Sequence, residues 1–69
     1  DCTMQILLNG NPKIITAPMT IARLLEDLLV PATAIVIELN KTILQPDCYA
    51  TTFLKDNDQM EIIRFVGGG

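Results

Sequence analysis

Histidine and tryptophan are absent from the 69 residues, and cysteine occurs only twice. Without histidine the chain has no Ser-His-Asp or Cys-His catalytic set and no imidazole ligand for a metal ion. Of the two thiols, Cys48 follows Asp47, whose negative charge disfavours a reactive thiolate. We therefore expect Cys48 to pack in the fold rather than react. We also expect no enzymatic activity, no bound cofactor and no metal site.

Positive charge is also scarce. Five Lys and Arg stand against eight Asp and Glu, which gives a net charge of −3, and the basic residues form no cluster. Nucleic-acid affinity comes largely from basic groups that neutralise phosphates, so we expect no nucleic-acid partner. No apolar run approaches the roughly 20 residues that cross a bilayer, and no basic segment precedes an apolar stretch at the start. The expected location is the cytoplasm, with no membrane partner and with Cys2 and Cys48 as reduced thiols.

Aliphatic side chains, by contrast, are plentiful. The chain is 49% hydrophobic, which suits one small folded domain. Two apolar runs, residues 4–8 and 13–16, flank Asn9-Gly10, a pair that accommodates the positive φ angles of a tight turn. This pattern predicts a β-hairpin. Residues 1–3, which precede Met4, are expected to be an extension outside the domain.

A helix is predicted after the hairpin. Thr20 is a suitable N-cap, because its hydroxyl can accept a hydrogen bond from the first turn. Apolar residues then follow at the i, i+3, i+4 and i+7 spacing of one buried helical stripe, namely Ile21, Leu24, Leu25 and Leu28. Since proline cannot continue a helix, we expect Pro31 to end it.

Three more strands are predicted, over residues 34–40, 42–44 and 59–66, with a turn at Asn40-Lys41. Residues 47–54 contain Tyr49, and a short helical turn there is expected to plug the core. The order is β-β-α-β-β-β, and the last strand is expected to lie beside the first in parallel. The prediction is an α+β fold over residues 4–66, a four- to five-stranded mixed sheet packed on one main helix. This is the β-grasp, or ubiquitin-like, architecture.

The last six letters of the chain are "RFVGGG", residues 64–69. Glycine has no Cβ, so a glycine-only segment can thread in extended form through a narrow channel of another protein. Residues 67–69 are therefore predicted to form a flexible tail. In it, Gly67 and Gly68 would be the threading segment, and Gly69 would carry the carboxylate that a partner enzyme activates.

Side chains near the last strand are candidates for docking. Glu38, Asp58 and Glu61 are predicted to form an acidic face that suits a basic partner surface. Phe65 and Val66 are two apolar residues directly before the glycines, and two interpretations stay open for them: contact with the same partner, or packing in the core.

These elements together resemble the ThiS family of sulfur carrier proteins of thiamine biosynthesis, over residues 4–69. The matching segments are "MQILLNG", "TIARLLEDL", "AIVIELN", "DNDQMEII" and "VGGG". The resemblance implies that an E1-like (ThiF-like) enzyme uses ATP to adenylate the Gly69 carboxylate, which then becomes a thiocarboxylate. Sulfur would come indirectly from a cysteine desulfurase and would be donated to thiazole synthase (ThiG-like). The chain itself would be a protein co-substrate.

Two other interpretations stay open from the sequence. A molybdopterin synthase small subunit (MoaD-like) shares the fold and the Gly-Gly end, although the short chain and the "ELN" segment favour the thiamine carrier. A ubiquitin-like interaction module without chemistry shares the fold, but it makes no use of the last carboxylate.

Overall fold

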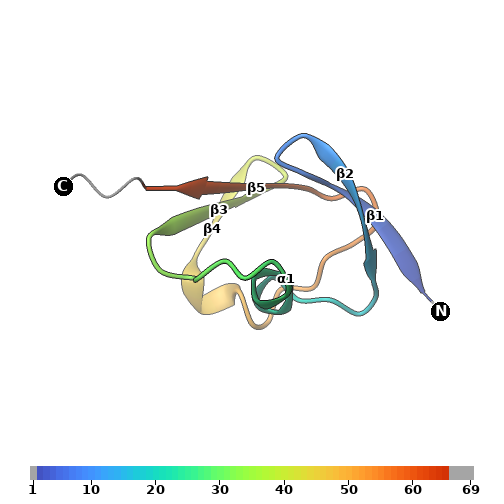
Figure 1. The fold of residues 1–69 in the computed structure, drawn as a ribbon, viewed down its shortest axis with the longest axis horizontal. Helices are drawn as coiled ribbons and strands as arrows, with labels where there is room; N and C mark the ends of the chain where they lie inside the picture. The colour runs from blue at the N-terminus through green and yellow to red at the C-terminus, as the bar shows by residue number, and fades with distance from the viewer. Residues whose placement is uncertain (1, 66–69) are drawn as a thin grey trace.

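A computed structural model describes residues 2–65 of the chain and shows one mixed sheet packed against one α-helix (Figure 1). The sheet has five strands in the order β2-β1-β5-β3-β4. β1 pairs with β5 in parallel, and the other pairs are antiparallel, so the predicted β-grasp order is confirmed. The elements are β1 (Thr3–Leu8), β2 (Asn11–Thr16), α1 (Ile21–Asp27), β3 (Ile35–Leu39), β4 (Thr42–Leu44), the 3-10 helix η1 (Pro46–Cys48) and β5 (Gln59–Arg64).

The first hairpin turns at Asn9 and Gly10, whose φ angles are 51° and 83°. Positive φ at both central residues is the geometry of a type I′ turn, which matches the twist of the flanking strands. β2 starts at Asn11, two residues earlier than predicted, and therefore includes Pro12. Proline is tolerated there because β2 is an edge strand, where a missing N–H need not leave a ladder bond unmade.

Helix α1 begins as predicted but ends earlier. The Thr20 hydroxyl accepts a hydrogen bond from the Arg23 N–H at 3.1 Å. The helix ends at Asp27 and not at Pro31, because Leu29 adopts a left-handed conformation with φ of 58°. The Leu29 N–H donates to the Glu26 carbonyl, and the next N–H, from Val30, donates to the Leu25 carbonyl. These two bonds form a Schellman motif, so the main chain has already left the helix when it reaches the proline.

The second hairpin confirms the predicted turn at Asn40 and Lys41, whose φ angles are 52° and 70°. Because Asn40 belongs to the turn, β3 is shorter than the predicted strand over 34–40. The predicted helical turn over 47–54 is reduced to η1, at Pro46–Cys48. β5 ends at Arg64, earlier than the predicted end at Val66, because the described residue Phe65 already lies outside the strand; Val66 itself is not among the described residues.

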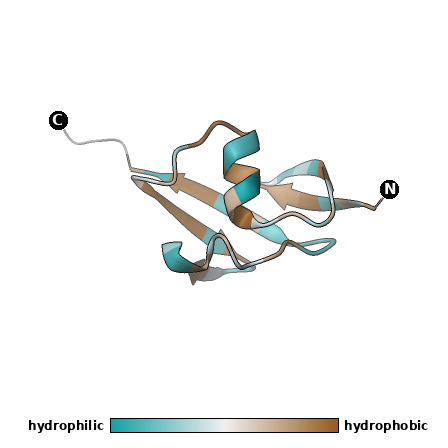
Figure 2. Ribbon diagram, turned by 90° about the horizontal axis from the view of Figure 1, so that it is seen from below, coloured by the Kyte–Doolittle hydropathy of each residue, from teal (hydrophilic) through white to brown (hydrophobic). Residues whose placement is uncertain are grey.

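The core lies between the sheet and α1. Fully buried side chains come from the three central strands and from the helix, namely Ile6, Ile21, Leu24, Leu25, Ile37 and Met60. Figure 2 shows that the strands carry mostly hydrophobic residues, whereas α1 carries both hydrophobic and hydrophilic ones, as expected of a helix with one buried face. Tyr49, directly after η1, is 5% exposed and packs in the same cluster, which confirms the predicted plug.

Asp58 is part of the fold and not of an exposed acidic face. It is 5% exposed. Its carboxylate accepts a hydrogen bond from Asn40 Nδ2 at 3.0 Å and another from the Lys55 N–H at 2.7 Å. The predicted docking role of Asp58 is therefore wrong, because its carboxylate joins the second hairpin to the turn before β5.

The helix stripe gives the first test. Replacing Leu25 with Ala removes a side chain that is 2% exposed, and we expect a loss of about 2–5 kcal/mol in the free energy of unfolding. Ile14 is 62% exposed on the edge strand, so Ile14→Ala should cost no more than about 0.5 kcal/mol. Urea denaturation of both variants measures the difference, and equal losses would contradict the burial of the stripe.

The Asp58 contacts give a second test. Asp58→Ala leaves two donors without their acceptor and should lower the free energy of unfolding by about 1–3 kcal/mol. The matched variant Glu61→Ala removes a carboxylate of the exposed sheet face and should leave stability nearly unchanged. If thermal melting found both variants equally stable, Asp58 would not hold the hairpin to β5.

Candidate partner interface

The last strand of the described chain lies in the middle of the sheet. β5 lies between β1 and β3, and the residue after it, Phe65, donates its N–H to the Ala34 carbonyl at 3.0 Å. The Phe65 side chain is 59% exposed, so it is not packed in the core, and its docking role stays a prediction. Val66 and the three glycines, Gly67, Gly68 and Gly69, lie outside the described residues, so their predicted roles stay predictions.

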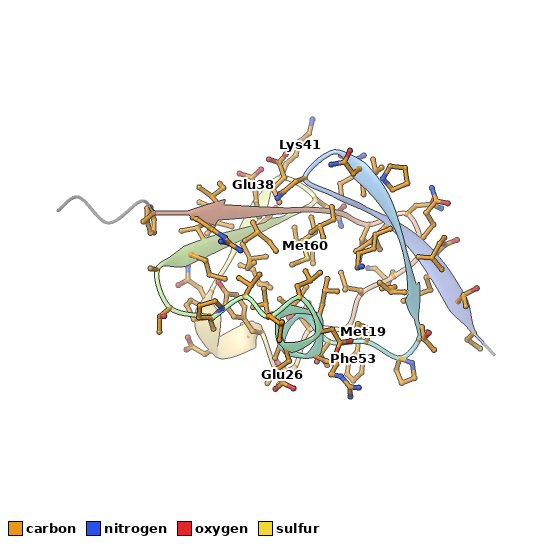
Figure 3. The ribbon with its side chains drawn as sticks, in the orientation of Figure 1. Met19, Glu26, Glu38, Lys41, Phe53 and Met60 are labelled. Carbon is orange, nitrogen blue, oxygen red and sulfur yellow. The ribbon has the colours of Figure 1, made fainter. Side chains whose placement is uncertain are left out.

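The sheet face turned away from α1 carries a mixed patch of acidic and apolar side chains on β3, β4 and β5. Cross-strand register places Glu38 opposite Glu61, and Val36 opposite Ile63, while Ile43 lies on the other side of Glu38. Partners in register point to the same face. Figure 3 shows Glu38 on the side of the sheet away from α1 and Met60 on the side that faces it. These five residues, Val36, Glu38, Ile43, Glu61 and Ile63, are called the sheet patch below.

The electrostatics of the sheet patch favour a basic partner. Glu38 and Glu61 are direct cross-strand neighbours, and like charges in that position repel each other. Within residues 2–65 the one ion pair joins Arg23 to Asp27, so neither glutamate is neutralised by a cation of the described residues. A lysine or arginine from another protein would relieve the repulsion.

Apolar side chains surround the two glutamates. Ile43 is 60% exposed and Ile63 is 45% exposed. The prediction of an acidic face thus named two correct members, Glu38 and Glu61, but missed the isoleucines. The two-residue turn at Asn40-Lys41 was a usable signal, because it sets the register that brings Ile43 beside Glu38.

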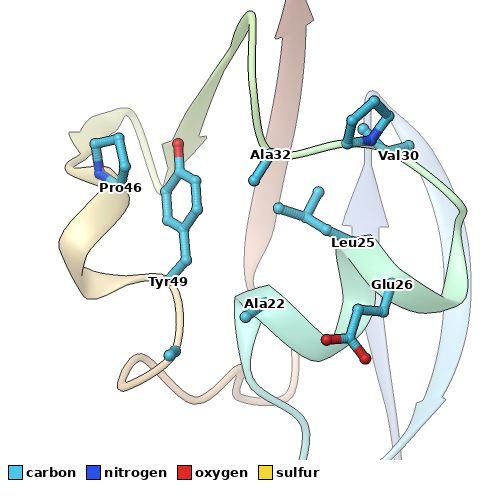
Figure 4. Close-up of a pocket in the computed structure, with 9 residues that line it drawn as sticks. Ala22, Leu25, Glu26, Val30, Ala32, Pro46 and Tyr49 are labelled. Atoms are coloured by element: carbon cyan, nitrogen blue, oxygen red, sulfur yellow. The ribbon is translucent and has the colours of Figure 1, made fainter.

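Two grooves lie on the helix side of the sheet. One, of about 420 Å³, is mostly apolar and lies between α1, the loop that follows it and η1, with Leu25, Ala32 and Tyr49 among its lining (Figure 4). The other, of about 410 Å³, lies beside the end of β5 and is lined by Leu8, Asn9, Leu28, Val30, Ile62 and Arg64.

The described residues show few other groups of chemical interest. Cys2 and Cys48 are both free and exposed, so the expectation that Cys48 packs in the fold is wrong: η1 turns it outward. No three His, Cys, Asp or Glu side chains between residues 2 and 65 are placed to hold a metal ion. In the same range, no helix has the length and apolar character needed to cross a membrane.

Known proteins resemble this chain in both sequence and structure. The crystal structure of the thiamine biosynthesis protein ThiS from Geobacter metallireducens superposes with a TM-score of 0.81 at 30% identity, and the match covers 96% of this chain and 100% of that one. A solution structure of a thiamine biosynthesis protein from the same organism gives a TM-score of 0.79 at 32% identity, with 96% and 88% of the two chains covered.

Relatives are also found by sequence. Over 66 residues, 96% of the chain, it is 36% identical to the uncharacterized protein ycf40 of Porphyra purpurea, of which the match covers 93%. It is 35% identical, again over 66 residues, to a thiazole synthase of Paramagnetospirillum magneticum. The chain spans about a fifth of the length of that thiazole synthase, since the match covers 20% of it.

The characteristic sequence pattern of the ThiS family matches residues 6–69, nearly the whole chain and including the three glycines. Together with the parallel β1–β5 pairing and the close superposition on a ThiS crystal structure, this match shows that the chain belongs to the ThiS family.

Proposed function

We propose that this protein is a sulfur carrier of thiamine biosynthesis, and that Gly69 carries the sulfur. The observation that carries the proposal is the family match, which continues without a break from the β-grasp body through the glycines. In the proposed reaction, a carboxylate oxygen of Gly69 attacks the α-phosphorus of ATP and releases pyrophosphate. The resulting acyl adenylate is an activated electrophile, because AMP is a far better leaving group than oxide.

Sulfur then replaces the nucleotide. A persulfide sulfur attacks the carbonyl carbon and displaces AMP, which forms an acyl disulfide. A second thiol next attacks the sulfur of the S–S bond that belongs to the persulfide donor, so that a new disulfide forms between the two thiols and the other sulfur leaves as the thiocarboxylate of Gly69. An E1-like, ThiF-like enzyme would supply the adenylation site and use the ATP, and a cysteine desulfurase would be the indirect source of the persulfide. The chain binds no cofactor in this scheme, and we place the reaction in the cytoplasm.

The glycines matter because each step happens in the active site of another protein. A segment without Cβ atoms lets the partner's main chain approach closely, and it imposes no side chain on the channel. The body supplies what the glycines lack, a surface large enough to be recognised. We propose that the sheet patch, with Phe65 and Val66 beside it, docks on a partner surface that presents basic and apolar side chains.

Thiazole synthase is the proposed acceptor of the sulfur. The support is the similarity between this chain and a segment of proteins named thiazole synthase in Paramagnetospirillum magneticum and Magnetococcus marinus. A carrier and its acceptor within one polypeptide would meet at high effective concentration. The molybdopterin alternative has no comparable support, since the matching family and structures are those of ThiS.

Intact-mass measurement tests the proposal. The full chain, incubated with the adenylating enzyme, ATP and a sulfur source, should gain the mass difference between one sulfur and one oxygen atom. Deletion of Gly69 should abolish the gain without changing the melting temperature, because a terminal glycine contributes no core contacts. No gain with an enzyme that modifies its own carrier would favour the interaction module.

Threading gives a graded test. Gly68→Val places a branched side chain in the channel and should slow thiocarboxylate formation by about a hundredfold, the effect of misplacing a reacting group by about an ångström. Gly68→Ala adds a single methyl group and should slow it less. Single-turnover rates with the adenylating enzyme separate the two, and wild-type rates for the valine variant would show that the channel is not narrow.

A further inference from the structure

β5 extends beyond one of its two neighbours. β1 pairs with Gln59 and Met60, whereas β3 pairs with β5 as far as Arg64. The chain leaves β1 by turning at Asn9. Among the described residues, the last part of β5 therefore has a strand on one side and none on the other.

The hydrogen-bond pattern shows which groups face the open side. The Asn40 N–H donates to the Gln59 carbonyl at 2.7 Å, and the Phe65 N–H donates to the Ala34 carbonyl at 3.0 Å. Hydrogen-bonded pairs alternate in an antiparallel ladder, so the odd-numbered residues of β5 bond to β3. The main-chain groups of the even-numbered residues point toward the β1 side.

The main-chain groups of these even-numbered residues have hydrogen-bond partners only as far as the Ile62 N–H. The Met60 carbonyl accepts the Asn9 N–H at 2.9 Å. The Ile62 N–H donates to Asn9 Oδ1 at 2.8 Å. This side-chain oxygen takes the place of the main-chain carbonyl that a longer β1 would offer. Beyond it, the Ile62 carbonyl and the N–H and carbonyl of Arg64 have no hydrogen-bond partner within residues 2–65. They form a short free edge at the end of the strand that leads to the glycines.

A groove lies under this free edge. The groove of about 410 Å³ is lined by four aliphatic side chains, of Leu8, Leu28, Val30 and Ile62, together with Asn9 and Arg64. Arg64 is exposed and forms no ion pair with the described residues. Free main-chain groups beside an apolar side-chain site are the two components of recognition by strand addition.

We propose that an extended segment of the adenylating enzyme adds to β5 at Ile62 and Arg64, with an apolar side chain in the groove and a carboxylate against the Arg64 guanidinium. The inference rests on the proposed carrier function and locates the binding site of the enzyme at the end of β5. An acidic segment is the matching occupant because Arg64 is the charged group of the groove. The position matters because Arg64 lies directly before Phe65 and the tail.

The two faces of β5 therefore suit partner residues of opposite charge. Arg64 lies on the helix side of the sheet with Ile62, whereas Glu61 lies on the sheet patch. A partner that places a basic residue over the sheet patch and an acidic residue in the groove holds the strand in one register. A shift of the added segment by one residue would exchange the faces of its side chains. The tail would therefore enter the active site at one defined depth.

Amide hydrogen exchange of the full chain tests the inference directly. In the free protein the Arg64 N–H should exchange faster than those of Ile63 and Phe65, which belong to the β3 side. In complex with the adenylating enzyme, the Arg64 exchange should slow by at least about tenfold, because a new hydrogen bond must open first. The measurement uses the wild-type chain, so no variant has to fold.

Substitutions at Arg64 separate the charge from the main-chain bond. Arg64→Ala removes the guanidinium and should raise KM for adenylation by about tenfold. Arg64→Pro also removes the N–H that faces the free edge, while sparing the bonds to β3, and should raise KM a further roughly fivefold. Lys55→Ala makes the same change in net charge on the turn before β5 and should leave KM unchanged. Melting temperatures confirm that each variant folds.

The outcomes distinguish this inference from the carrier proposal. A chain that gains the sulfur mass while its Arg64 amide exchanges at the free rate in the complex would overturn strand addition and keep the carrier function. Protection of Arg64 by thiazole synthase alone would overturn the choice of partner. Protection by the adenylating enzyme without any mass gain would keep strand addition and reject the carrier.

Discussion

The pairing of β5 between β1 and β3 is the interaction on which the rest of the structure depends. It joins the start of the described chain to its end, and its parallel half is short, covering Gln59 and Met60. Side chains and turns extend it: Asp56 Oδ1 accepts the Gln5 N–H at 2.9 Å, and the Asn57 N–H donates to the Gln5 carbonyl at 2.7 Å. Both bonds join segments about fifty residues apart in the chain, so together they strengthen a contact whose formation costs loop-closure entropy.

Two asparagines in hairpin turns contribute to the same strand. Asn9 and Asn40 both adopt left-handed conformations, which asparagine tolerates better than most residues. The side chain of Asn9 accepts the Ile62 N–H, and that of Asn40 accepts the Gln59 N–H at 2.9 Å. Each residue therefore shapes a local turn and also satisfies a main-chain donor of β5. The turns and the central strand are coupled, because a change in either hairpin removes a partner from β5.

Local chemistry made most of the fold predictable. The Asn9-Gly10 and Asn40-Lys41 turns and the Thr20 cap follow from short-range preferences, and the parallel β1–β5 pairing follows from the order of elements. The errors have a different origin. Leu29 ends the helix in a conformation that leucine seldom adopts, and Asp58 is buried because two donors meet it from separate segments. The local sequence predicts neither the conformation of Leu29 nor the donors that reach Asp58 from distant segments.

The candidate site was predictable to the extent that it depends on composition. The prediction of a glycine tail came from composition alone, whereas the sheet patch depends on register and the free edge depends on where β1 stops. Both are properties of pairs of strands. β1 pairs only with Gln59 and Met60, whereas β3 pairs with β5 as far as Arg64, so the last described part of β5 is held to the body through β3.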